Sequence, residues 1–116
     1  MIAMPDIEVQ MAFEERVLRA WHEAHGAGAG TVSSSWGTDR VVVMIDDALL
    51  KGEWLLAQSA AGREMLEKYV NALLAYVVSE ERAGLDALLP QRIMAASGSV
   101  NSEERWVMFV FRLADG

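Results

Sequence analysis

The stretch that most constrains the fold runs from Asp39 to Val77, where a dense apolar segment leads into a long helical tract. Residues 41–45 read VVVMI, and this run of β-branched residues predicts a strand with apolar side chains on both faces. Such a strand belongs in the centre of a sheet. The tract after the acidic pair Asp46 and Asp47 is amphipathic, so it can cover one face of that sheet. The rest of the chain has to pack around this unit.

Hydrophobic periodicity and turn residues predict elements in the order α-β-β-α-α-β-β. In chain order we expect a helix over 6–25, strands over 31–37 and 39–46, helices over 49–59 and 60–81, a helical turn over 85–89 after Gly84, and strands over 91–98 and 105–113. The long helix has a predicted apolar stripe, which consists of Met65, Leu66, Tyr69, Val70, Leu73 and Val77. Residues 99–104 then form the last hairpin loop.

We expect one domain, because 116 residues can build a single hydrophobic core but not two. The two hairpins most simply make one four-stranded antiparallel sheet with the helices packed on one face, which is an α+β fold. Residues 1–5 are expected to be disordered. The Gly-rich residues 26–30 are expected to form a flexible connector.

The last strand has apolar side chains on both faces. Its two alternating sets are Val107, Phe109, Phe111 and Leu113 on one face, and Trp106, Met108, Val110 and Arg112 on the other. The helices can cover only one face of the sheet. We therefore expect Trp106, Met108 and Val110 to form the interface of a homodimer.

Charge and composition exclude several classes of function. The net charge is −7 and the ten Lys and Arg residues are scattered, whereas nucleic-acid binding needs clustered cations. The chain has no cysteine, which excludes disulfides, thiolate nucleophiles and thiolate metal ligands. No apolar run approaches the ~20 residues of a membrane-spanning helix, and the start lacks the pattern of a secretory signal. We expect a cytoplasmic protein without direct membrane insertion.

The block DRVVVMIDDALLKGEWLLAQSAAGREMLEKYVNALL resembles a small known family. In that family a strand, a short acidic turn and a helix with an early Glu precede a Gly-Arg-Glu that opens a long helix. Glu53 and Gly62-Arg63-Glu64 carry this pattern here, and SEERWVMFVFRL is similar to the family's final strand. The family is the YbcI-like or MpsC-like domain, and the resemblance spans roughly residues 8–113. It implies a soluble accessory component of a sodium-translocating, membrane-potential-generating system linked to inorganic carbon uptake, with uncharacterised biochemical activity.

The chain departs from that family at two places. The family typically opens the short helix with a Thr-Pro-Ala-Glu capping box, whereas residues 50–53 (LKGE) keep the Glu and lose the hydroxyl. Residues 90–93 (PQRI) replace a Gly-Val-Lys-Val type of start to the third strand. These differences mark a divergent member of the family that the chain resembles.

Two pairs of side chains could carry chemistry by their residue type. His22 and His25 are spaced to reach one metal ion, but further ligands have no evident source. We interpret them as a solvated helix end, where the helix dipole favours histidine. Asp46 and Asp47 could be an acid/base pair or a cation site if the chain turns there, but aspartates at a strand end are also ordinary turn residues.

Two small-residue segments resemble known motifs only by composition. The Gly-rich connector leads from a helix into a strand, which is the reverse of a phosphate-binding loop. Ser33 to Ser35 offer hydroxyl groups but no nucleophile elbow, so we interpret them as part of a polar edge strand.

Arg63 and three tryptophans are the remaining candidates for a binding site. Arg63 lies near a helix start, which disfavours cations, so it indicates either a bound anion or partner carboxylate, or an internal salt bridge with Glu53 as a candidate partner. Trp36, Trp54 and Trp106 could line a ligand pocket. We favour core packing for Trp54 and an oligomer interface for Trp106.

Three functions therefore compete. The first is a non-catalytic, homodimeric accessory or regulatory protein that assists a membrane ion or inorganic-carbon transport system. The second is a sensor that binds a small anion or other small molecule near Arg63, and the third is an enzyme that uses Asp46 and Asp47. We assign no catalytic residue, no metal site and no cofactor, and the expected partners are a second copy of the chain and a membrane transport protein.

Overall fold

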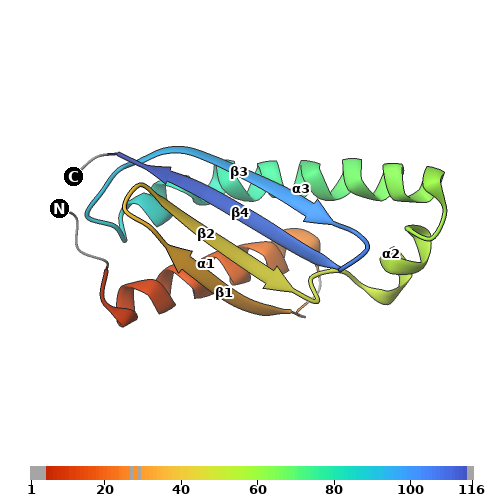
Figure 1. Ribbon diagram of the computed structural model, residues 1–116, viewed down its shortest axis with the longest axis horizontal. Helices are drawn as coiled ribbons and strands as arrows, with labels where there is room; N and C mark the ends of the chain where they lie inside the picture. Colours follow the sequence, from red (N-terminus) through yellow and green to blue (C-terminus); the bar gives the residue numbers. More distant parts are fainter. Residues whose placement is uncertain (1–4, 27, 29, 115–116) are drawn as a thin grey trace.

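The computed structural model describes residues 5–26, 28 and 30–114 and shows an α+β fold (Figure 1). Its elements are α1 (Ile7–His25), β1 (Thr31–Trp36), β2 (Arg40–Asp46), α2 (Lys51–Leu56), α3 (Ala60–Asp86), β3 (Ile93–Asn101) and β4 (Trp106–Leu113). The predicted order α-β-β-α-α-β-β is confirmed. The predicted disorder over 1–5 falls mostly outside the described residues, and the carbonyl of Pro5 accepts a hydrogen bond of 2.8 Å from the Gln10 side chain.

The four strands form one antiparallel sheet in the order β1-β2-β4-β3. The two hairpins lie side by side, so that the strands richest in apolar residues, β2 and β4, pair with each other in the centre. The predictions of an apolar central strand and a Ser-rich edge strand are both confirmed. Between the hairpins, α2 and α3 connect β2 to β3.

Both long helices pack on the same face of the sheet, behind it in the view of Figure 1. Asp6 caps α1 by accepting from the Val9 N–H at 3.0 Å, and Gly26 ends it in a left-handed conformation with φ 86°. The core between helices and sheet consists of large side chains with less than 2% exposure, among them Phe13, Trp21, Val43, Leu74, Phe109 and Phe111. Each contributes about 1.5–3 kcal/mol by leaving water.

The molecule is elongated, with extents of 47 × 22 × 21 Å, because α3 is 27 residues long. The start of α3 and the short helix α2 reach past the end of the sheet (Figure 1). The two helices meet at Gly62, where an added Cβ would overlap the carbonyl oxygen of Leu56. This close approach explains why the Gly-Arg-Glu segment begins with glycine.

Several predicted boundaries were wrong. The helix predicted over 60–81 continues through Gly84 to Asp86, and the short helix covers only Lys51–Leu56 rather than 49–59. The third strand extends to Asn101, which shortens the hairpin loop to residues 102–105. The helix passes Gly84 because this glycine lies under the guanidinium group of Arg16 on α1 and serves close packing there.

The predicted apolar stripe of the long helix is partly wrong. Met65 and Tyr69 are 64% and 52% exposed, whereas Leu66 and Val70 are buried. Consecutive residues lie about 100° apart around a helix, and the sheet and α1 cover only one side of α3. No helix in the described ranges is long and apolar enough to cross a membrane.

Candidate functional site

The solvent face of the sheet has an apolar centre framed by small polar side chains. Val42 pairs with Val110, and Met44 pairs with Met108, across the two central strands. Serines flank both pairs on the edge strands, at Ser33 and Ser35 of β1 and at Ser97 and Ser99 of β3. We call Val42, Met44, Trp106, Met108 and Val110 the outer-face patch, and all five side chains are partly exposed.

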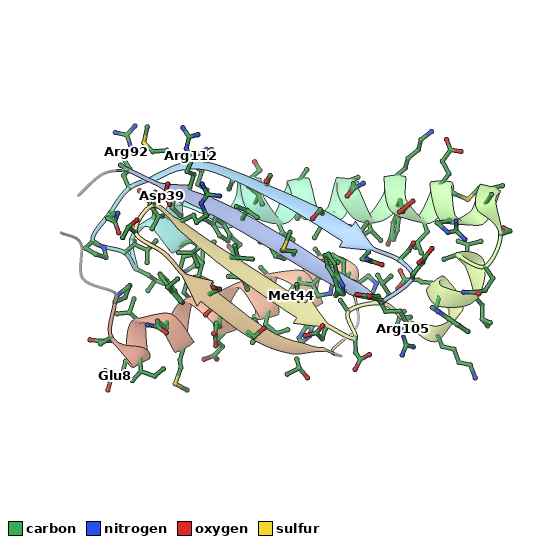
Figure 2. All side chains as sticks on the ribbon, in the orientation of Figure 1. Glu8, Asp39, Met44, Arg92, Arg105 and Arg112 are labelled. Atoms are coloured by element: carbon green, nitrogen blue, oxygen red, sulfur yellow. The ribbon has the colours of Figure 1, made fainter. Side chains whose placement is uncertain are left out.

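The fold brings the predicted interface residues Trp106, Met108 and Val110 together on this face. Sequence reasoning missed Val42 and Met44, which complete the patch. The signal was present, because VVVMI is apolar on both faces and only one set of its alternating residues can enter the core. Figure 2 shows Met44 on the face of the sheet that carries no helix. That Trp106, Met108 and Val110 bind a second copy stays a prediction.

Opposite charges lie at the two ends of this face. Arg40 and Arg112 are cross-strand partners at one end, and Arg92 lies near Arg112 there (Figure 2). Asp46 ends β2 at the other end on the same face as Met44, and Asp47 follows it. The guanidinium of Arg105 lies 3.6 Å from the Asp47 carboxylate, and the two side chains are 42% and 75% exposed. The face is therefore mainly basic at one end, where the Arg40 Nε also lies 3.4 Å from the Asp39 carboxylate, and mainly acidic at the other.

Arg63 and Glu53 do not form a salt bridge within the described residues. The Arg63 Nε donates a hydrogen bond of 3.3 Å to the carbonyl of Ala57. Its side chain lines a shallow depression with Glu67 and Glu103. These two carboxylates disfavour a bound anion, since like charges repel.

Glu53 instead holds His25 at the end of α1. The Nε2 of His25 lies 2.8 and 2.9 Å from the two carboxylate oxygens of Glu53, and the His25 ring stacks on Trp21 with centroids 4.6 Å apart. The His25 side chain is 2% exposed, so the predicted solvated helix end is wrong for this residue. The reason is that the Trp21 ring and the Glu53 carboxylate cover the imidazole. Glu53 also accepts a hydrogen bond of 2.7 Å from the Leu50 N–H, which keeps half of the capping box.

The aspartate pair lies at the turn after β2, and the middle serine of β1 points into the molecule. Asp46 and Asp47 are exposed, and Asp47 turns the chain with φ 52°, as expected for turn residues. Ser34 points inward, where its hydroxyl donates to Glu14 and accepts a hydrogen bond of 2.9 Å from the Trp36 Nε1. In the part of the chain that the structure describes, no group of three or more His, Asp or Glu side chains could hold a metal ion.

The tryptophan that lies in the core is not the one that was predicted to lie there. Trp54 is half-buried and lines a shallow depression with Lys51 and Arg105, so its predicted place in the core is wrong. Trp21, which is completely buried, is the tryptophan of the core. Trp36 packs edge-to-face on Phe13 at 5.4 Å.

Comparisons with family models, with curated proteins and with solved structures found no match to this chain. The most distinctive surface of the described residues is the face of the sheet that the helices leave uncovered.

Proposed function

We propose that the protein acts by binding other proteins rather than by catalysis, as a homodimer that forms through the outer-face patch. The main supporting observation is that five apolar side chains gather on a sheet face that none of the described helices covers. An apolar patch of this extent on the surface of a single chain is often a binding site. A second copy of the chain is the occupant that fits best, because the face is complementary to itself.

Charge determines how the two copies would lie. A two-fold axis in the plane of the interface can run along the strands or across them. An axis along the strands places Arg40 of one copy over Arg112 of the other, which is repulsive. An axis across the strands places Arg40 over Asp46 of the second copy and Arg112 over its Trp106, which gives an ion pair and a cation–π contact. We propose the second arrangement.

The size of the face predicts a modest affinity. Four strands spaced about 4.8 Å apart over about six residues present roughly 400 Å². A standard stable interface uses about 800 Å² on each partner. We therefore expect a dissociation constant in the micromolar range, and the apolar centre provides most of the binding energy.

A charge exchange tests this arrangement. Arg40→Asp and Asp46→Arg should each weaken the dimer several-fold, because each places like charges together across the axis. The double variant should return to the affinity of the unmodified protein. Sedimentation velocity over a range of micromolar concentrations measures this. Two single variants that leave the dimer unchanged, or a double variant weaker than either one, would exclude the proposed orientation.

The partner of the dimer is proposed from the resemblance to the MpsC-like family, which implies an accessory role beside a membrane transport system. An affinity pull-down from membrane and soluble fractions, read by mass spectrometry, tests this role. Stoichiometric recovery of a membrane transport protein would support it. Recovery of the bait alone would exclude a stable complex with a membrane transport protein. The homodimer is tested separately, by the mass of the protein in solution.

A further inference from the structure

A groove runs between α3 and the free edge of the sheet. One wall consists of α3 side chains that include Asn71, Ala75 and Arg82, and the other consists of Ala96 to Gly98 of β3. Its volume is about 520 Å³, which is within the range of ligand-binding clefts. This groove lies at the edge of the sheet and is separate from the outer-face patch.

The edge strand beside this groove lacks the usual protection. β3 is nine residues long, reads IMAASGSVN, and contains neither a charged residue nor a proline. Natural edge strands are normally shortened, charged, bulged or covered, because their unpaired N–H and C=O groups can pair with another chain. A bulge lies only at its start, between Ile93 and Ala95. From Ala96 to Val100 the outer edge meets no other strand of the described residues.

Arg82 covers the Ile93 end of the unpaired edge of β3. Its Nη2 donates hydrogen bonds of 2.9 and 3.0 Å to the carbonyls of Ile93 and Met94, while Asp86 one turn later accepts from the Ile93 N–H at 2.6 Å. An added strand therefore cannot continue past Met94. Arg82 is exposed and is the only charged residue among those described that line the groove, and its other N–H groups are available to a ligand.

The groove also has room for the side chains of an added strand. Gly98 lies so close to α3 that an added Cβ would stand 2.8 Å from the Leu74 Cβ, so the strand and the helix meet at the bottom of the groove. Above this contact the walls carry small side chains, Ala75, Ala96 and Ser97. Alternate side chains of an added strand would point into this space.

We propose that this groove binds the C-terminal end of an extended peptide, which adds to β3 as an antiparallel fifth strand. In an antiparallel pair the peptide runs opposite to β3, so its C-terminus lies at the Ile93 end. The edge stops there at Arg82, whose remaining N–H groups can pair with the free carboxylate, while the Asp86 carboxylate at this end is already bound to the Ile93 N–H. Main-chain hydrogen bonds to β3 provide affinity, and Arg82 selects a chain end over an internal segment.

The test uses a library of short random peptides displayed with free C-termini and selected on the intact protein. Enriched peptides are then synthesised with a fluorescent label and with either a free carboxylate or a C-terminal amide. We expect the free acid to bind about tenfold more tightly than the amide, and Arg82→Gln to remove that difference. Ala75→Trp, which fills the groove, should abolish binding of both. Ala72→Trp, on an exposed position of the same helix outside the groove, is the matched control and should bind normally.

Hydrogen exchange distinguishes strand addition from other ways of binding. A bound peptide should slow the exchange of amides between Ala95 and Val100 and leave the exchange of amides in the central strand β2 unchanged. Failure to enrich any peptide would overturn the proposal, as would peptides that bind Ala75→Trp and Arg82→Gln as tightly as the unmodified protein. If Ala75→Trp lowered the mass of the assembly in solution, the groove would be occupied by a second copy of the chain. This result would also overturn the proposal. The proposal does not rest on the outer-face dimer.

Discussion

At the scale of residues, the Glu53 carboxylate links helices α1 and α2. In the chain these two helices are separated by the Gly-rich connector and the first hairpin. It accepts a hydrogen bond from the Leu50 N–H at the start of α2 and lies against the buried ring of His25 at the end of α1. The His25 Nδ1 has no hydrogen-bond partner among the described residues. The imidazole therefore depends on Glu53 for its polar contact.

We predict that Glu53→Ala lowers the free energy of unfolding by about 1–3 kcal/mol, because it leaves a buried imidazole unpaired and removes the cap of α2. Urea denaturation followed by circular dichroism measures this. Glu64→Ala is the control, because among the described residues Glu64 forms an ion pair only with Lys68, at 3.5 Å on the exposed side of α3. This variant should lose about 0.3 kcal/mol of stability. Equal losses in the two variants would contradict the structural role of Glu53.

The pairing of His25 with Glu53 could not be predicted from the sequence. Helical periodicity places His25 on a face of α1, but it does not say which distant element covers that face. The two residues are 28 positions apart. In contrast, the loss of the capping hydroxyl at Leu50 and the retention of Glu53 were read directly from residues 50–53, and the hydrogen bond from Leu50 to Glu53 confirms that half of the capping box remains.

At the scale of elements, glycines determine how closely the helices approach their neighbours. Gly62 lets the start of α3 pass against the end of α2, and Gly84 lets α3 pass under Arg16. A glycine within a helical pattern is compatible with a helix end or with a close contact, and the pattern alone therefore ended the long helix too early. The hairpins were predicted well, since alternation in β4 separates its two faces without information from distant residues.

We predict that Gly62→Ala destabilises the protein by about 1–3 kcal/mol, because the new methyl group overlaps the Leu56 carbonyl and forces the two helices apart. Gly52→Ala is the matched control, since nothing lies within 4 Å of an added Cβ at Gly52 in α2. That substitution should be neutral or stabilise by up to about 1 kcal/mol. Chemical denaturation of both variants measures the difference. A Gly62→Ala variant as stable as Gly52→Ala would show that α2 and α3 do not meet as described.

At the scale of the whole molecule, the sheet divides the chain into a covered face and an open one. The α+β class and the helices on one face were predictable, because two hairpins and three amphipathic helices have few compact arrangements. The pairing of β2 with β4 was not part of that prediction. It is this pairing that places Val42 and Met44 beside Val110 and Met108 and makes one patch from two strands.

The most direct test of the account is the mass of the protein by sedimentation velocity at micromolar concentrations, compared with Met108→Arg and Tyr69→Arg. We predict a dimer for the unmodified protein and for Tyr69→Arg, whose side chain is exposed on the helical layer. Met108→Arg should be a folded monomer, because it buries a charge at the centre of the patch. A monomer for the unmodified protein at all concentrations, or a dimer that Tyr69→Arg breaks and Met108→Arg does not, would contradict the central claim.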